Sequence, residues 1–521
     1  MINKILPDPN FQSLFVAALI SKRTDLNDQQ RASIILACPK VNTYERNEIR
    51  SALEYVAEVK ISESALKPQP SNWPSIRQIK TAQAQAQEWF DRGIFVLTAE
   101  QLHLPANEIA VLPPIFFAYG SRQVLNQPRA AILNSRKPRQ IHPQSRWVQV
   151  ARQAFQMIKQ NDYGLATSLG NNPYELVCCL SKMNGQPTLI ISDSLLPFML
   201  PGEKIEAFLK KYDQMFPVEK TLFLSPFTPG RVSPLRQRAI QRDHCLVTLS
   251  SYILAAEIRA DGNMERFISE AVKQGKTVKV FQPENFDRST AGNKSLLDLE
   301  PRTFRLGADN VKNTLKIKHP SLPNQDVIQS NLENNSFLIH FTRSCPGPWP
   351  GETLYEYYKA LLEGNNGAAH TAFDTLYRIL SEQRIRGSDR LIRGQIPVVS
   401  FTAQPLKKLK ELIRWRRGLI RWVFEPYGVA IAKNVLRELG ACPVIYCGDE
   451  GWKQLKDDQK YRFQLHQPPD TNWTMEKEWR LPGDLDLKTI PKKDVRIILP
   501  SVQEARQIAF AFRCQPVLAT G

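Results

Sequence analysis

The chain has 521 residues, of which 42% are hydrophobic and 23% charged, and this length predicts two to four globular domains with ample core material. The formal net charge of +18 favours polyanionic partners, because lysine and arginine displace the counterions that condense on phosphates. No apolar run is long enough to cross a bilayer, and the apolar stretch at 14–20 lacks the basic start and cleavage site of a secretion signal. We therefore expect a cytoplasmic protein without a membrane partner.

The eight cysteines and seven histidines show no metal-ligand spacing. No two cysteines form a C-x-x-C pair, and several lie inside apolar runs. This pattern favours reduced, buried thiols, and it predicts neither a disulfide framework nor a metal site. No motif of the sequence requires a cofactor.

Residues 1–105 show apolar residues at helical spacing, with turns that contain proline and serine between them. The expected helices are 11–20, 28–37, 44–57, 74–86 and 87–92. We interpret this region as a helical N-terminal module. A helical spacer or interaction domain is one reading of it.

From Leu112 to Pro283 short apolar runs alternate with amphipathic stretches. The expected strands are 130–133, 163–167, 188–192, 221–224, 246–249 and 277–281, and the expected helices include 147–159 and 263–274. The alternation predicts an α/β fold, with a doubly wound parallel sheet covered by helices on both faces and a Rossmann-like domain at 106–286. In such sheets ligands bind beyond the carboxyl ends of the strands.

Two loops near these strand ends are rich in arginine, one at 134–139 and one reaching 235–238. Cationic loops in this position predict a site for a phosphate or a nucleic-acid backbone. Gly170 follows another strand, where glycine permits a tight turn with positive φ. The candidate nucleic-acid or phosphate-binding residues are Ser135, Arg136, Arg139, Gly170, Arg236 and Arg238.

This region resembles the Rossmann-like domain of the DprA/Smf DNA-processing proteins. Residues 112–120 resemble the entry to that domain, and 131–136 resemble its first strand and "GSR" loop, with Asn134 where glycine is usual. The LRQR run at 235–238 is similar to the family's "RNR" element, and 256–262 resemble a later acidic strand end with its "SG" loop. Small helical modules precede this domain in the family.

The sequence departs from the family at the "SGxAxGID…H" stretch, which would fall on 167–172 and the following helix. Asn172 stands where aspartate is expected, and Leu176 where histidine is expected. The resemblance implies binding of single-stranded DNA or a nucleotide. If the family role carries over, it also implies transfer of single strands to RecA, a homodimer and DNA-mediated transformation. The alternative is a divergent domain that keeps the fold and has lost the ligand.

Residues 287–335 are rich in turn-forming residues and predict a linker. Residues 336–521 predict a separate α+β C-terminal domain, because strands and helices no longer alternate regularly. The expected strands are 337–342, 398–402, 427–431, 444–446, 479–481 and 495–499, and the expected helices are 369–382, 432–439 and 503–512.

Polar residues on these C-terminal strands suggest chemistry. His340, Thr402, Glu476 and Glu478 are the candidate catalytic residues. Glu476 and Glu478 would face the same way if both lay on one strand. A histidine could orient a ribose, and a carboxylate could stabilise developing positive charge on a bound nucleotide.

This arrangement resembles the DarT-like ADP-ribosyltransferases. The resemblance implies NAD as a substrate, and a two-part protein of phage defence or toxin systems whose C-terminal domain acts on NAD or nucleic acid. A non-enzymatic scaffold is the alternative. In that case His340 is a satisfied core histidine, and residues 476–480 form an exposed strand salt-bridge pattern.

Residues 407–422 predict a basic helix, with apolar residues at helical spacing and cations on the other side. Arg414 and Arg417 are its candidate phosphate contacts, and Trp415 and Trp422 could stack on bases. The alternative is an amphipathic surface helix that only packs on the core.

Overall fold

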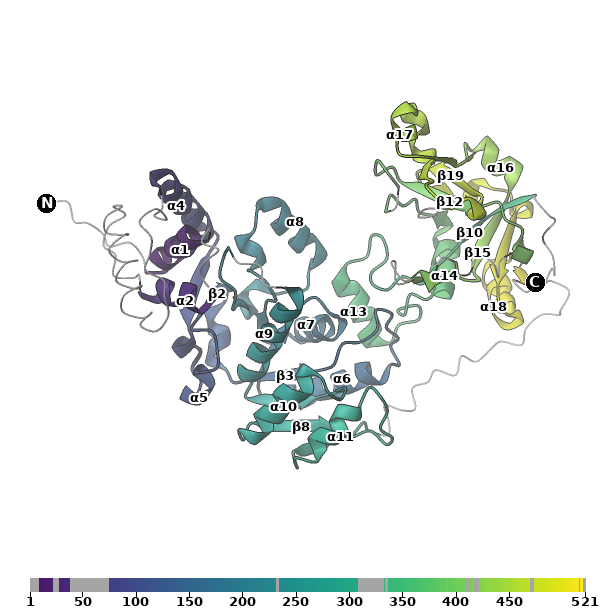
Figure 1. Ribbon diagram of the computed structural model, residues 1–521. Coiled ribbons are helices and arrows are strands. Elements are labelled where there is room, and N and C mark those ends of the chain that lie inside the picture. The colour runs from purple at the N-terminus through teal and green to yellow at the C-terminus, as the bar shows by residue number, and fades with distance from the viewer. Residues whose placement is uncertain are drawn as a thin grey trace. The chain divides into compact units, whose positions relative to one another are not determined.

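The computed structural model describes residues 9–21, 28–37, 75–230, 234–307, 332, 336–390, 392–408, 413, 415–416, 421–422, 424–468, 473–514 and 516–518. It divides into two compact units, which are described separately below (Figure 1). The first unit is Met1–Arg139, Pro143–Thr314 and Pro350–Asn365, and the second is Gln140–His142, Leu315–Trp349 and Asn366–Gly521. Within the described ranges, no helix combines the length and the apolar character that a membrane span needs.

Among the described residues, three helices precede the sheet of the first unit: α1 (Pro9–Ile20), α2 (Asp28–Ala37) and α4 (Ile76–Asp91). α1 packs on α4, where the rings of Phe11 and Phe90 lie 5.8 Å apart. These helices confirm the expected ones at 11–20 and 28–37 and join 74–86 and 87–92 into one helix, whereas 44–57 lies outside the described residues. The range 1–105 predicted for the helical module extends too far, because residues 94–98 form a sheet strand.

A sheet of nine strands forms the centre of the described part of the first unit. Its strands are β1 (Ile94–Thr98), β2 (Ile115–Gly120), β3 (Arg129–Leu133), β4 (Gly164–Ser168), β5 (Thr188–Ile191), β6 (Thr221–Ser225), β7 (Tyr252–Ala255), β8 (Thr277–Phe281) and β9 (Arg302–Phe304). They lie in the order β1-β2-β6-β5-β4-β3-β7-β8-β9. Neighbours from β6 to β9 pair in parallel, and β1 and β2 add an antiparallel edge. This order confirms the doubly wound fold, with its switch point between β3 and β7.

Helices alternate with these strands. They are α5 (Ala106–Ile109), α6 (Arg146–Gln160), α7 (Asn172–Asn184), α8 (Gly202–Lys211), α9 (Leu235–Thr248), α10 (Asn263–Lys273) and α11 (Ala291–Leu297). Asn171 caps α7 by accepting a hydrogen bond from the backbone of Tyr174 at 3.1 Å, and Gly185 ends it with a φ of 62°. The strand expected at 246–249 was wrong, because these residues form the end of α9 and the strand follows at β7. A short apolar run fits a buried helix turn as well as a strand.

Two segments from beyond residue 286 belong to the first unit. α11 and β9 lie in the predicted linker, and β9 extends the sheet by pairing with β8. α13 (Leu354–Glu363) lies within the range predicted for the C-terminal domain, but it packs against α7 (Figure 1). The Tyr358 hydroxyl of α13 donates to Glu175 of α7 at 2.9 Å.

The second unit has a seven-stranded sheet among its described residues, in the order β16-β19-β12-β10-β15-β21-β22. The strands are β10 (Phe337–Phe341), β12 (Val398–Thr402), β15 (Gly428–Ala432), β16 (Cys442–Pro443), β19 (Glu478–Pro482), β21 (Val495–Leu499) and β22 (Pro516–Leu518). Helices α14 (Ala372–Glu382), α16 (Lys433–Glu438) and α18 (Val502–Phe512) contribute buried side chains to a core with one face of the sheet. This mixture of mainly antiparallel strands and helices confirms the α+β class.

The helix expected at 407–422 was wrong at residues 415–416 and 421–422, whereas residues 407 and 408 belong to a short 3-10 helix, η8 (Leu406–Lys408). β13 (Trp415–Arg416) pairs antiparallel with β14 (Arg421–Trp422), and Trp415 lies opposite Trp422. Tryptophan favours strands, which accounts for the pairing. Arg414 and Arg417 lie outside the described residues.

Candidate nucleic-acid interface

The loop after β3 is joined to the loop after β7 at the switch point. The buried side chain of Asn134 accepts a hydrogen bond from the backbone of Glu257 at 3.0 Å. The backbone N–H of Ser135 donates to the Glu257 carbonyl at 2.9 Å, and the Ser135 hydroxyl accepts from Arg259 N at 2.9 Å. Asn134 therefore joins the two loops that border the switch-point crevice, at the position where the resemblance expects glycine.

A carboxylate of the chain itself fills this crevice. Glu257 is buried and forms ion pairs with Lys137 and Arg146. Arg146 also reaches Asp287 at 2.8 Å. Burial lowers the pKa of Lys137, and the neighbouring Glu257 carboxylate opposes that shift. Both cations are thus committed to internal partners at the place where a Rossmann-like domain would hold a phosphate.

The N-terminus of α7 is filled in the same way. Gly170 is exposed with a φ of +86°, a conformation that glycine reaches without strain, and its N–H donates to Glu175 at 3.3 Å. The buried Glu175 carboxylate also accepts from the hydroxyls of Tyr212 at 2.8 Å and Tyr358 at 2.9 Å. Burial raises the pKa of the Tyr358 hydroxyl, so it stays protonated as a donor. A helix N-terminus is a usual anion site, and here the anion is Glu175.

The predicted arginines lie outside these filled positions, along the carboxyl ends of the strands. Arg136, Arg139 and Arg236 are exposed, and within the described part of the chain none of the three pairs with a carboxylate. Arg238 is half-buried and donates to the carbonyl of Asp193, in the loop after β5, at 3.3 Å. We call Arg136, Arg139, Arg236 and Arg238 the basic edge.

Hydrogen bonds hold the loops that carry the basic edge. The Asn172 side chain of α7 donates to the carbonyl of Pro138 at 2.7 Å, which fixes the β3 loop against the loop after β4. Arg136 and Arg139 follow β3, and Arg238 contacts the loop after β5. These two strands are two strand spacings apart, or roughly 10 Å. The Nε of Arg238 is buried and has no hydrogen-bond partner among the described residues.

The second unit does not bring its histidine and its glutamate together. Ile339 lies opposite Thr402, and Thr402 lies opposite Glu478, so Glu478 shares their face of the sheet. His340 lies on the other face, where its ring centroid is 6.0 Å from that of Phe401. The Nδ1 of His340 makes a 2.9 Å hydrogen bond to the carbonyl of Ser400. His340 is half-buried, and the backbone of Ser400 satisfies one of its ring nitrogens.

Glu476 and Glu478 do not lie on one strand, and that expectation was wrong. Glu476 ends a short 3-10 turn, η10 (Thr474–Glu476), Lys477 has a φ of 44°, and β19 begins at Glu478. The left-handed residue breaks the alternation on which the prediction depended. The Thr402 hydroxyl donates to the carbonyl of Glu476, so Thr402 is also used internally.

Glu478 forms the ion pair with Arg480 that the alternative placed in an exposed pattern, but here the pair belongs to a largely buried polar network. Its carboxylate accepts from the Ser400 hydroxyl at 2.8 Å and from the guanidinium of Arg480 at 2.8 and 3.0 Å. Arg480 is only 1% exposed and also donates to the carbonyl of Phe463 at 2.7 Å. Strand alternation predicts that Glu478 and Arg480 lie on one face of the sheet. The hydrogen bond from Arg480 to the carbonyl of Phe463 could not be predicted without the fold.

Burial makes His340 a source of acid sensitivity. It lowers the pKa of His340 to about 4, so the folded unit holds a neutral imidazole while the unfolded chain titrates near 6.5. The neutral imidazole therefore stabilises the folded unit fully above pH 6.5. The free energy of unfolding then falls by at most about 3 kcal/mol as the pH falls towards 4. We expect the difference in unfolding free energy between the wild type and His340→Gln to shrink over this range. Urea titrations of the second unit's transition at several pH values measure it, and a pH-independent difference would contradict it.

Comparison with known proteins gives limited similarity. No protein-family model matches the sequence, and no curated protein matches it. Among solved structures, DNA processing protein A of Streptococcus pneumoniae is 14% identical, with 56% of this chain and 94% of that chain covered and a TM-score of 0.37. DNA processing protein A of Helicobacter pylori, described for its single-stranded DNA binding mode, is 18% identical. The similarity covers 37% of this chain and 82% of that chain, with a TM-score of 0.28.

A molybdenum cofactor binding protein from Rippkaea orientalis is 14% identical, with 36% of this chain and 93% of that chain covered and a TM-score of 0.22. None of these similarities is high enough to assign a ligand or an activity to this chain. Among the described residues, no group of three or more His, Cys, Asp or Glu side chains is placed to hold a metal ion.

Proposed function

We propose that the first unit binds single-stranded DNA along the basic edge. The observation that carries this proposal is that Arg136, Arg139 and Arg236 are exposed at the carboxyl edge of the sheet and form no ion pair with the described residues. Exposed guanidinium groups that have no internal partner are suited to phosphates. The net charge of +18 adds a long-range attraction for a polyanion.

A strand suits this surface better than a free nucleotide. A mononucleotide in a Rossmann-like domain places its phosphate in the switch-point crevice or at a helix N-terminus. Here Glu257 fills the crevice and Glu175 fills the N-terminus of α7. A strand can instead place successive phosphates on the outer arginines without displacing either carboxylate.

The cellular role in this proposal is DNA processing in the cytoplasm. Transfer of strands to RecA, a homodimer and a part in transformation or phage defence rest on the sequence resemblance. An ADP-ribosyltransferase activity of the second unit remains a prediction from sequence, which the placement of His340 and Glu478 on opposite faces does not favour.

Removing a phosphate contact should weaken binding and its dependence on salt. We expect Arg136→Ala and Arg236→Ala each to weaken binding of a dT oligonucleotide and to reduce the slope of log affinity against log salt by about 0.7. Fluorescence anisotropy at several salt concentrations measures both quantities. The matched control is Arg302→Ala, because Arg302 is also exposed but lies at the amino end of β9, on the opposite edge. Unchanged affinity and slope in both edge variants would refute the assignment.

A competition experiment separates a strand from a nucleotide. Mononucleotides added in excess should fail to displace the oligonucleotide, because the positions that would hold a single phosphate are occupied by Glu175 and Glu257. Displacement at low mononucleotide concentration would show that the ligand is a nucleotide and would overturn the choice of a strand.

A further inference from the structure

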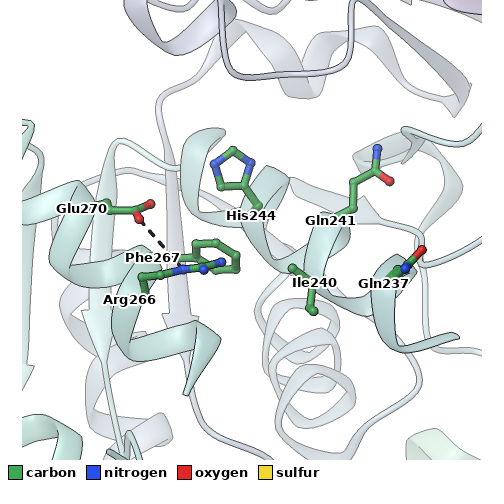
Figure 2. A pocket seen from close by; sticks show the side chains of 7 residues that line it. All are labelled: Gln237, Ile240, Gln241, His244, Arg266, Phe267 and Glu270. Carbon is green, nitrogen blue, oxygen red and sulfur yellow. Dashed lines mark ion pairs between the residues drawn. The ribbon is translucent and has the colours of Figure 1, made fainter. Parts of the chain in front are cut away.

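A shallow groove of about 410 Å³ lies between α9 and α10 of the first unit (Figure 2). α9 contributes Gln237, Gln241 and His244, and α10 contributes Arg266 and Phe267. Each helix follows a parallel strand, so both helices begin at the carboxyl edge of the sheet. The groove runs along α9 from Gln237 to His244 and along α10 from Arg266 to Glu270, and Arg236 and Arg238 flank Gln237 in the sequence of α9.

The floor of the groove is aromatic. The His244 ring is half-buried and lies beside Phe267, with 5.1 Å between ring centroids. Burial lowers the pKa of His244, so the imidazole is neutral near pH 7. The guanidinium of Arg266 packs over the Phe267 ring at 4.9 Å. A neutral flat ring with a cation nearby is a suitable surface for stacking a base.

The wall formed by α9 is polar but uncharged. Gln237 and Gln241 are four residues apart and therefore lie on one face of the helix (Figure 2). Each side-chain amide offers both a donor and an acceptor, as the edges of nucleobases do. Glu270 is the carboxylate of the groove, and its 3.9 Å ion pair with Arg266 offsets its charge.

We propose that this groove is a nucleobase-binding site. Bases of the strand whose phosphates contact Arg236 and Arg238 stack on His244 and meet the amides of Gln237 and Gln241. The inference rests on the proposed function and adds that the first unit holds bases as well as phosphates. Continuity along one helix supports it, because the first turn of α9 carries Arg236 and Arg238 of the basic edge together with Gln237, the first residue of the groove. Stacking with few edge contacts predicts broad tolerance of base sequence.

The test compares two strands of equal length on the full chain, a dT oligonucleotide and an abasic strand with the same phosphates. His244→Ala should weaken dT binding roughly 5- to 150-fold, which corresponds to one stacked base, and leave abasic binding unchanged. His244→Phe should retain dT binding, because it keeps an aromatic ring. Gln237→Ala changes an exposed residue and should weaken dT binding alone, which keeps the test valid if His244→Ala unfolds.

The binding measurements distinguish the ways in which the proposal could be wrong. If the wild type binds neither strand, the proposed function itself is wrong. If Arg236→Ala weakens both strands while His244→Ala and Gln237→Ala weaken neither, the basic edge stands and the nucleobase site is refuted. Equal losses on the dT and abasic strands would also refute it. A variant that lowers the particle mass in solution would assign the groove to a second copy of the chain and overturn the proposal.

Discussion

Replacing Glu257 with glutamine should lower the free energy of unfolding of the first unit by about 3–5 kcal/mol, the cost of breaking a buried ion pair by removing one partner. The side chains of Glu257 and Lys137 are both 5% exposed, so the variant leaves the Lys137 ammonium in the interior without its counter-charge. Arg146 loses a partner as well, although it keeps Asp287 at 2.8 Å. Chemical denaturation of the first unit's transition measures the loss.

The pH dependence and a second substitution identify the cause of that loss. Burial already lowers the pKa of Lys137, and without Glu257 the pKa should fall further. The loss should therefore diminish as the pH rises and Lys137 becomes neutral. Lys137→Met in the Glu257→Gln background should recover part of the stability by removing the unpaired charge.

An exposed ion pair gives the matched control for Glu257. Glu270 on α10 is 51% exposed and lies 3.9 Å from Arg266. Glu270→Gln should change the unfolding free energy by less than about 1 kcal/mol, as is typical of surface pairs. If Glu257→Gln behaves like Glu270→Gln, the carboxylate does not hold the switch point, and the crevice would be open to a ligand phosphate.

The doubly wound sheet could be predicted because local pattern and fold agree there. Fully buried parallel strands such as β4 and β5 are short apolar runs between amphipathic helices. The pattern failed at 246–249, where the buried end of α9 has the same composition as a strand. It also could not predict that β1 and β2 would pair antiparallel at the edge, since pairing order is a property of the whole sheet.

The exposed half of the candidate site could be predicted, and the buried half could not. Arg136 and Arg236 follow strands in sequence, so their place at the carboxyl edge follows from topology. The carboxylates that fill the crevice and the α7 N-terminus depend on distant partners. Lys137 and Glu257 are 120 residues apart, and Tyr358 and Glu175 are 183 residues apart. Only the folded chain shows that these positions are occupied.

In the second unit, the alternation of apolar and polar residues predicted the strands. It did not predict whether the candidate catalytic side chains share one face of the sheet. His340 lies on β10 and Glu478 on β19, and β12 stands between these two strands. Whether the two side chains share a face depends on the register of both pairings, and the positive φ of Lys477 shifts where β19 begins. No local feature of the sequence sets that register.

Replacing Glu478 with glutamine tests whether this carboxylate is structural or catalytic. It accepts hydrogen bonds from Ser400 and Arg480, and Arg480 is 1% exposed. We expect the variant to lose about 3–5 kcal/mol of unfolding free energy in the second unit, because a buried guanidinium is left without its counter-charge. Ser400→Ala removes one hydrogen bond and should cost about 1 kcal/mol. Glu438→Gln, at an exposed position on α16, should have no measurable effect.

Incubation of the same variants with NAD and DNA separates the two roles. A structural Glu478 predicts that the Glu478→Gln chain unfolds more easily, and that wild type and variant alike give no turnover of NAD. A catalytic Glu478 predicts the opposite pair of results, turnover by the wild type and a variant that is as stable but inactive. The second outcome would require the sheet face that carries Ser400 and Glu478 to act without His340, because pleat alternation places that ring on the other side. The hydrogen bonds already made by both oxygens of Glu478 favour the first outcome, since Ser400 and Arg480 hold the carboxylate through three hydrogen bonds within the sheet.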